Sequence, residues 1–507
     1  MPATAETSEA YATVSSKLKE LSALNGISGL MMWDEMVMMP DGAAEARGNQ
    51  KAALAGVVHD KCTDAELGTL LASLSGVKEQ LDPIQAAVVR DAHSSFIKST
   101  AIPKELAQRM ARLETEGYGA WVKARTSSDF SLFAPFLQQW VEINQQKARL
   151  INPSLPSYDV LLDDFEKGMT SERLDQIFTQ VRDGLIPLIA QIKASPHQLS
   201  DAWLKGSYSV ETQASLCKKV ALDLGFDMGK GRLDVSVHPF TGGSHPTDVR
   251  ITTRFKPDNL MEGLTGAIHE TGHALYEQGR NLEHDGLPVN SALGMGIHES
   301  QSLLWERMVA LSPPFSKYLL PLLKESFPKE FADVSERQLY ESMNVIASPS
   351  LIRVESDEVT YPMHVILRYE IERGLMSGSI KVKDLPTVWN AKMKEYLGDV
   401  PPTDAQGCLQ DVHWSSGAFG YFPTYSLGAM YATQIFDCAK KSVPGLEEKM
   451  AAGDFKELKA WLNAKIHSVG SLHANGDELM VAVTGAPLDP SIFLKYLRDK
   501  YTDLYKL

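Results

Sequence analysis

His269-Glu270-Thr271-Gly272-His273 is an HExxH motif. Two histidines four residues apart lie on the same face of a helix, so both imidazoles can reach one metal ion. The glutamate directly after the first histidine points beside the metal, where a base must sit to take a proton from metal-bound water. The motif therefore predicts a metal site in which Glu270 is the catalytic base.

The residues around the motif predict that it lies on a helix. Asn259, with Glu262 three residues later, resembles a capping box at the helix start. Gly279 is a suitable residue for the helix end. An apolar stripe with the spacing of a helix lies between them and consists of Leu264, Ile268 and Leu275.

A catalytic zinc site normally has three protein ligands and an open position for water, so this helix lacks one ligand. Glu299 is the favoured candidate, because it follows the motif by roughly one helical hairpin; we expect residues 302–311 to be helical. His298 is the alternative, although a histidine beside a ligand more often supports it. Two histidines and a downstream glutamate make a gluzincin-like site. The metzincin pattern HExxHxxGxxH is excluded, because Tyr276 and Gly279 stand where it requires Gly and His.

A change of pattern just before the motif predicts two β-strands. Leu233, Val235 and Val237 alternate with polar residues, and a similar alternation runs through residues 249–255. A glycine-rich segment at 241–246 lies between them and is expected to be a loop. Such a strand could pair with the main chain of an extended peptide, or the hairpin could be purely structural.

The remainder of the chain is rich in helix-forming residues, so we expect a mainly α protein. We expect a single domain over residues 1–507, with N-terminal helices at about 1–225, a small β region at about 231–256 and metal-binding helices at about 258–312. A looser stretch rich in proline and glycine is expected at 398–428.

The composition argues against several kinds of partner. A net charge of −14 disfavours nucleic acid and anionic membranes. No apolar run is long enough to span a bilayer. The 4 cysteines are far apart and form no CxxC pair, which indicates free thiols in a reducing compartment. Because no signal peptide is visible at 1–10, we expect a cytoplasmic protein.

Downstream segments supply further candidates for substrate binding. Arg353 could bind a carboxylate in bidentate fashion, although an arginine among acidic residues most often forms a structural ion pair. His413 stands beside a tryptophan, and a lone histidine is normally structural. Tyr421 and Tyr425 could donate to an oxyanion, although aromatic residues near glycine and proline are more often simply packed.

The order of these segments resembles the carboxypeptidase Taq (M32) family of zinc peptidases, and the resemblance spans almost the whole chain. That family has, in order, the motifs HPF, DxRxT, HExxH, HES, IRxxAD and GxxQDxHW. The corresponding residues here are His238-Pro239-Phe240, Asp248 to Thr252, His269 to His273, His298-Glu299-Ser300, Ile352-Arg353 with Asp357, and Gly407 to Trp414. Ser356 stands where the family pattern has Ala, and Val37 stands where many relatives have Thr.

The resemblance implies a nearly all-helical body cut by a deep groove, with a small sheet at its edge and a metal at the groove floor. Its zinc ligands would be His269, His273 and Glu299, with Glu270 as the base; Co²⁺ suits the same ligands as Zn²⁺. Arg353 would hold the terminal carboxylate of the substrate. The residues that contact the substrate backbone or the oxyanion would be His238, His413 and either Tyr421 or Tyr425.

Three functions are compatible with these residues. The first, which the resemblance favours, is a zinc carboxypeptidase that removes single residues from peptide C-termini with broad specificity; members of the family are typically homodimers. The second is a zinc endo-oligopeptidase with the same chemistry. The third is a helical binding protein with a structural zinc ion, but such sites are normally closed by four ligands, often cysteines, and no cysteine lies near the motif.

Overall fold

The chain folds mainly into helices around one small sheet, in agreement with the expected fold class. The structure, a computed structural model, describes residues 4–507; residues 1–3 of the expected N-terminal region lie outside the described residues. The elements up to the sheet are α1 (Ala5–Val37), α2 (Ala44–Cys62), α3 (Ala65–Gly76), α4 (Pro83–Thr100), α5 (Lys104–Ser127), α6 (Ala134–Ile151), α7 (Ser157–Leu162), α8 (Ser171–Ala194), α9 (Val210–Leu224), β1 (Gly231–Val235), β2 (Thr241–His245) and β3 (Asp248–Thr253). The later elements are α10 (Leu260–Gln278), α11 (Met295–Leu303), the π-helix η7 (Leu304–Ala310), α12 (Pro313–Ser326), α13 (Glu336–Ser342), α14 (Tyr361–Ser377), α15 (Leu385–Leu397), α16 (Pro423–Ser442), α17 (Leu446–Ala451), α18 (Lys456–Leu462), the π-helix η11 (Asn463–His467), α19 (Gly476–Thr484) and α20 (Pro490–Tyr505).

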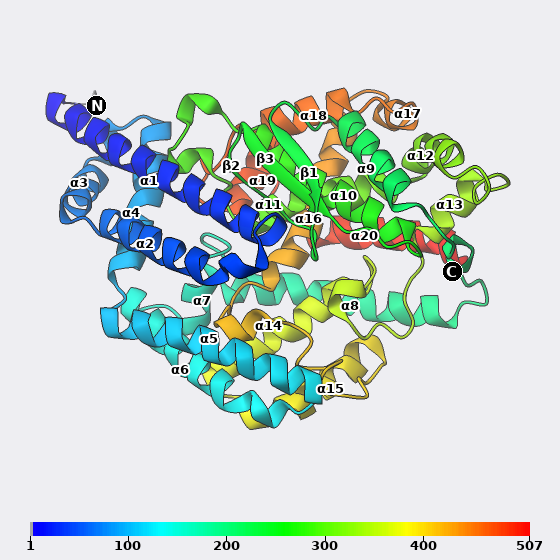
Figure 1. The fold of residues 1–507 in the computed structure, drawn as a ribbon, viewed down its shortest axis with the longest axis horizontal. Helices are drawn as coiled ribbons and strands as arrows, with labels where there is room; N and C mark the ends of the chain where they lie inside the picture. Colours follow the sequence, from blue (N-terminus) through cyan, green and yellow to red (C-terminus); the bar gives the residue numbers. More distant parts are fainter. Residues whose placement is uncertain (1–3) are drawn as a thin grey trace.

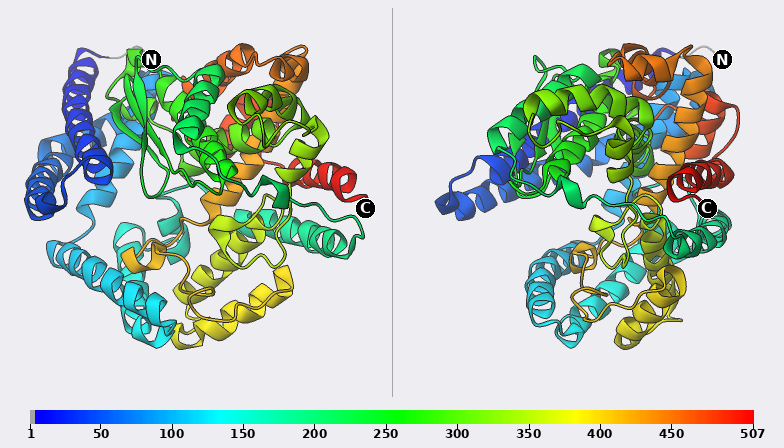
Figure 2. Two further views of the ribbon diagram at one scale, coloured as in Figure 1. Left: turned by 45° about the vertical axis from the view of Figure 1, so that its right-hand side comes forward. Right: turned by 90° about the vertical axis from the view of Figure 1, so that its right-hand side faces the viewer.

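The helices form two groups, which are joined by α16 (Figures 1 and 2). The sheet lies in one group together with α9 to α13, α17 and α18, whereas α5, α6, α14 and α15 form the other. Helix α16 packs against α11 in the first group and against α14 in the second. The largest apolar core runs through both groups without interruption, and this continuity supports our proposal of a single domain.

The sheet has three strands in the order β1-β3-β2, with β1 parallel and β2 antiparallel to β3. The two stretches of alternating residues contain β1 and β3, as predicted, but β1 ends before Val237 and β3 ends before Phe255. The glycine-rich segment between them was predicted as a loop, and this prediction is wrong, because the segment forms the edge strand β2. Gly243 has φ +130°, and a Cβ there would lie 2.0 Å from the carbonyl oxygen of Asp248. Glycine therefore lets the backbone come close enough to pair.

Helix α10, which carries the HExxH motif, has the predicted boundaries. The Asn259 side chain accepts a hydrogen bond from the Glu262 backbone N–H at 3.2 Å. The carboxylate of Glu262 does not complete the capping box, because it pairs with Arg254 and Lys256. Gly279 caps the C-terminal end, as predicted. The predicted apolar stripe is buried throughout, at Leu264, Ile268 and Leu275.

Helix α11, which carries Glu299, starts at Met295, earlier than the helix predicted for 302–311. Its N-terminal turn is held by the buried carboxylate of Glu166, which accepts a hydrogen bond from the Gly296 N–H. This contact comes from a distant part of the chain, so the local sequence carries no sign of it. Most of the segment predicted as an α-helix at 302–311 is also different, because residues 304–310 form η7, which has the wider turns of a π-helix.

Two glycines bring α10, α11 and α16 unusually close together. A Cβ on Gly272 of α10 would lie 2.6 Å from the Gln301 carbonyl oxygen on α11. A Cβ on Gly428 of α16 would lie 2.7 Å from Cγ of Glu299. Gly428 belongs to the stretch 398–428 that was expected to be loose, yet it lies inside a regular helix. Both close contacts fix the position of α11, and with it the position of Glu299.

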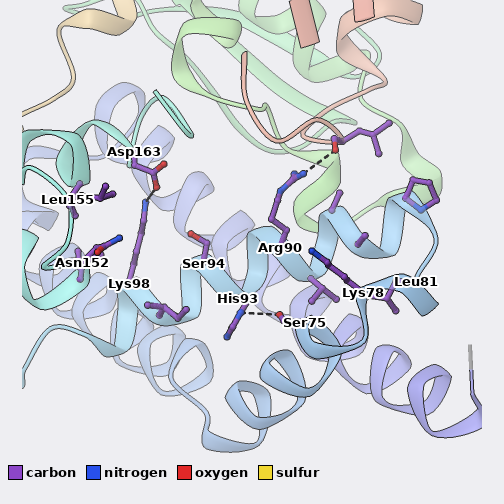
Figure 3. Close-up of a pocket in the computed structure, with 18 residues that line it drawn as sticks. Ser75, Lys78, Leu81, Arg90, His93, Ser94, Lys98, Asn152, Leu155 and Asp163 are labelled. Atoms are coloured by element: carbon purple, nitrogen blue, oxygen red, sulfur yellow. Dashed lines mark hydrogen bonds and ion pairs between the residues drawn. The ribbon is translucent and has the colours of Figure 1, made fainter. Parts of the chain in front are cut away.

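A cavity of about 820 Å³ lies along α4 (Figure 3). Lys98 spans it to Asp163 at 2.8 Å, and Arg90 donates to the backbone carbonyl of Leu472 at 3.2 Å. Helix α4 is thereby tied both to the segment after α7 and to the C-terminal part of the chain. None of the residues that line this cavity is among the predicted site residues.

Two expectations from the composition can be compared with the structure. The thiols are all free, at Cys62, Cys217, Cys408 and Cys438. Across residues 4–507, no helix is both long enough and apolar enough to cross a membrane.

We expect Gly272→Ala to destabilise the protein by about 1–3 kcal/mol, because its methyl group would overlap the backbone of α11. Gly56→Ala is the matched control, since it lies in the exposed part of α2 and a Cβ there would meet nothing within 4 Å. The control should be neutral or slightly stabilising, because alanine favours helix more than glycine does. Thermal unfolding followed by calorimetry would compare them; equal midpoints for the two variants would contradict the packing described above.

Candidate metal centre

Three predicted side chains converge where α10 meets α11. His269 and His273 from α10 and Glu299 from α11 offer ligand atoms that all lie within 4.8 Å of one another. The distance from His273 Nε2 to Glu299 Oε2 is 3.4 Å, and His269 Nε2 lies 4.0 Å from the same oxygen. All three side chains are only partly buried. We refer to these three residues as the triad.

The triad fits a divalent metal ion of the zinc type. Bonds of about 2.0–2.1 Å in tetrahedral geometry place neighbouring ligand atoms about 3.4 Å apart. The distance between His273 and Glu299 matches this value, and the distance from His269 requires only a small closure. Two imidazole nitrogens and one carboxylate oxygen leave a corner of the tetrahedron open, as in catalytic sites.

Glu306, on η7, orients His269. Its Oε2 lies 2.6 Å from His269 Nδ1, so Nε2 is the nitrogen that faces Glu299. Burial opposes protonation of His269, but the hydrogen bond and charge of Glu306, together with nearby carboxylates, raise its pKa to about 10. A metal that binds at Nε2 must therefore displace a proton, as metals generally do at histidine ligands.

The other two members of the triad are in their ligand forms. Burial, reinforced by the charge of His298, lowers the pKa of His273, which keeps its imidazole neutral. Burial opposes ionisation of Glu299, but the hydrogen bond with His273 and the charge of His269 lower its pKa to about 2. A neutral imidazole and an ionised carboxylate are the forms that bind metal.

His298, the alternative to Glu299, lies beside the triad and not in it. Its Nε2 is 2.9 Å from Glu277 Oε1, and Glu277 is also paired with Arg280 at 2.7 Å. The His298 ring stacks on His273, with ring centroids 4.6 Å apart. The contacts of His298 therefore support the position of His273. A histidine beside a metal ligand commonly has this supporting role.

Glu270 is buried and is held by a residue that the sequence analysis did not identify. The hydroxyl of Thr241, the first residue of β2, lies 2.6 Å from Glu270 Oε2 and 3.0 Å from its backbone oxygen. A hydroxyl has one proton, so it donates to one of these oxygens at a time. The edge strand β2 therefore positions the carboxylate that follows the first triad histidine.

Arg353 lies in a buried charged cluster. Its Nε donates to Asp411 Oδ1 at 2.9 Å, and its Nη1 donates to the hydroxyl of Tyr361 at 3.0 Å. Asp411 also pairs with Arg368, which is fully buried. The guanidinium of Arg353 lies over the ring of Tyr425, 4.8 Å from its centroid. The structural ion pair considered for Arg353 is present, and its geometry also directs Arg353 towards the aromatic residues.

His413 and the two candidate tyrosines lie together beside this cluster. His413 Nε2 is 3.3 Å from the hydroxyl of Tyr425, and the rings of Tyr421 and Tyr425 are 5.2 Å apart. Burial lowers the pKa of His413 to about 4, so it is neutral near pH 7. Burial and the charge of Glu299 raise the pKa of Tyr421 to about 12, which keeps its hydroxyl protonated and able to donate.

His238 is separate from both groups. It lies exposed in the segment before β2, and its backbone oxygen accepts a hydrogen bond from Ser236 at 2.6 Å. Within residues 4–507, its ring makes no hydrogen bond or ion pair with another predicted site residue and is not part of the triad. The structure thus places the predicted site residues in two groups, the triad with Glu270 and the cluster around Arg353, and leaves His238 outside both.

The residues that sequence reasoning missed support the predicted ones. Glu306 had a usable signal, because it follows Glu299 by seven residues, which is close to two helical turns. Thr241 had none, because its contact with Glu270 depends on how β2 packs against α10. Asp411 was quoted as part of a motif, but its pairing with Arg353 could not be derived from the spacing.

Comparisons with known proteins agree with this geometry. Residues 13–501 match the model of the carboxypeptidase Taq (M32) metallopeptidase family. The chain is 37% identical to thermostable carboxypeptidase 1 of Thermus thermophilus, over 98% of this chain and 99% of that protein. It is 36% identical to carboxypeptidase 1 of Bacillus subtilis, over 97% of each. The M32 carboxypeptidase structure from Deinococcus radiodurans R1 superposes with a TM-score of 0.94 at 36% identity, covering 98% of this chain and 100% of that one.

We expect Glu306→Gln to weaken metal binding about 10- to 100-fold, because His269 would lose the carboxylate that orients it and strengthens it as a ligand. Competition with a chelator of known affinity would measure the change. Glu116→Gln, an exposed position on α5, is the control and should leave the affinity unchanged. An affinity for Glu306→Gln equal to that of the control would show that Glu306 does not orient His269.

Proposed function

The chain belongs to the carboxypeptidase Taq (M32) metallopeptidase family and is a metallocarboxypeptidase; we propose that it removes single residues from peptide C-termini with zinc held by His269, His273 and Glu299. The observation that supports this proposal is the convergence of the three triad side chains beside Glu270. Glu270 is buried and is not one of the candidate metal ligands, so its carboxylate is free to act as a base. Co²⁺ could replace Zn²⁺, because both suit two imidazoles and a carboxylate.

Glu270 acts as the base in this proposal. A zinc ion at the triad would supply a Lewis acid for the scissile carbonyl and would lower the pKa of a water molecule. Glu270 takes a proton from the attacking water and later delivers it to the leaving amine. Because Thr241 bonds to Oε2 of Glu270, we assign the transferred proton to Oε1. Thr241 thus fixes the direction of the carboxylate without touching the substrate.

Removal of a terminal residue also requires a fixed cation for the free carboxylate. Arg353 is our candidate, because Asp411 and Tyr361 hold its guanidinium in place. A guanidinium has five N–H groups, so Arg353 keeps N–H donors that can bind a substrate carboxylate. Tyr421 and Tyr425 lie next to it and can donate to the developing oxyanion. His413, neutral and beside Tyr425, orients that hydroxyl.

We expect Glu270→Gln to retain its metal and to lower kcat by about 10²–10⁴-fold, since an amide cannot carry the proton. Metal content by atomic absorption and kcat on a short peptide would be measured on the same preparation. Added chelator should abolish the activity of the wild-type protein. Near-normal turnover by Glu270→Gln would remove Glu270 from the mechanism.

We expect a tripeptide with a free C-terminus to lose its last residue, and the same tripeptide amide to be spared. Arg353→Gln should lower kcat/KM for the free acid about 10- to 100-fold, because a charge-assisted bidentate contact is lost, and should leave metal content unchanged. Mass spectrometry of the products would identify the bond cut. Internal cleavage of the amide by the wild-type protein would instead favour the endo-oligopeptidase.

A further inference from the structure

Arg307, on η7, is a buried arginine whose guanidinium has neither an ion-pair partner nor a hydrogen-bond partner among the described residues. The described residues contain three buried arginines, of which Arg353 and Arg368 each pair with Asp411. Arg307 is 6% exposed, and its Nη1 is sealed from solvent with no hydrogen-bond partner. Within residues 4–507, no carboxylate lies at ion-pair distance from it, and no group accepts a hydrogen bond from its guanidinium.

An unpaired buried guanidinium destabilises the protein, because its hydration is lost without replacement. The carboxylates whose charges act on Arg307 all interact with other residues. Glu306 bonds to His269, Glu299 faces His273, and Glu358 pairs with Lys500. These acids keep Arg307 charged, because together they raise its pKa although burial opposes this. They do not supply the hydrogen-bond acceptors that a guanidinium needs.

The position of Arg307 connects the triad with the Arg353 cluster. Its guanidinium carbon lies 5.1 Å from the centroid of the Tyr361 ring, and that of Arg353 lies 5.8 Å from the same centroid. Two cations therefore lie beside one phenol. The Tyr361 hydroxyl accepts a hydrogen bond from Arg353 and still has its own proton to donate. Arg307 also lies on a π-helix, a distortion found frequently at functional sites.

We propose that Arg307 is the anion-binding residue of a second cationic subsite beside the triad, and that it takes a small anion of single negative charge. Two sources share this chemistry, namely the carboxylate of a C-terminal residue and a halide ion. The carboxylate source rests on the proposed function, because it is the free end of the peptide or of the released residue. A guanidinium matches a carboxylate in bidentate geometry.

The test measures ligand binding to the metal-loaded full-length protein by calorimetry. The probes are N-acetyl-leucine, N-acetyl-leucinamide and sodium chloride, and the variants are Arg307→Gln and Arg307→Lys. Arg109→Gln, an exposed position on α5, is the matched control. We expect the wild type and the control to bind the acid at least tenfold more tightly than the amide. Arg307→Gln should lose part of this preference, and the part that remains is due to Arg353. Arg307→Lys, which keeps the charge but not the fork, should lie between them.

The chloride experiment separates the two sources. If chloride competes with N-acetyl-leucine in the wild type and not in Arg307→Gln, a halide also occupies the subsite. If Arg307→Gln loses acid preference and chloride has no effect in either protein, the subsite binds the carboxylate. Loss of the chloride effect alone assigns the subsite to a halide. Unchanged acid preference and unchanged chloride effect in Arg307→Gln would overturn the proposal and leave Arg307 as a purely structural charge.

A second measurement covers the case in which Arg307→Gln does not fold. Wild-type crystals soaked in N-acetyl-leucine, and others soaked in sodium bromide, should show the ligand or the anomalous bromide signal against the Arg307 guanidinium. Density for neither would overturn the proposal. Peptide hydrolysis is assayed on the same wild-type preparation, so that an occupied subsite in a protein without C-terminal trimming would reject the proposed function and retain the anion site.

Discussion

The close packing of α11 between α10 and α16 is the constraint on which the candidate site depends. The HExxH motif supplies two histidines wherever it forms a helix, but Glu299 comes from a different helix and must be brought to them. Gly272 and Gly428 make this possible, because a side chain at either position would overlap α11 or Glu299 itself. Interiors are close-packed and deform little, so contacts of this kind restrict the position of α11 closely. The metal geometry is therefore a property of backbone packing as much as of the ligand side chains.

Charged side chains behind the candidate site residues orient them and set their charge. Carboxylates of Glu306 and Glu277 lie behind His269 and His298, while Asp411 lies between two arginines. The site thus has an acidic side, next to the histidines, and a basic side, next to the tyrosines. In the proposed function, the scissile carbonyl of a peptide would lie at the metal held by the triad, and its free carboxylate would lie at the basic side.

The sequence predicted those parts of the fold that local chemistry determines. The helix around His269, its capping residues and its buried stripe follow from spacing, and Glu299 followed from its distance along the chain. The parts that were wrong depend on contacts between distant segments. A glycine-rich segment is usually a loop, but Gly243 serves a close strand pairing in β2. The stretch around Gly428 looked loose because its glycine serves packing against Glu299. The start of α11 could not be located, because Glu166 holds it from another part of the chain.

Because η7 is a π-helix, the direction of Arg307 relative to Glu299 depends on the number of residues in η7. An α-helix rotates about 100° per residue, so a regular helix would turn Arg307 about 80° away from the direction of Glu299. The wider turns of a π-helix rotate less per residue and bring Arg307 back towards that side. Removing one residue that follows Arg307 in η7, such as Val309, would restore regular winding without changing any side chain of the triad. Such a shortened protein would keep its metal ligands and would lose the alignment between them and the basic side of the site.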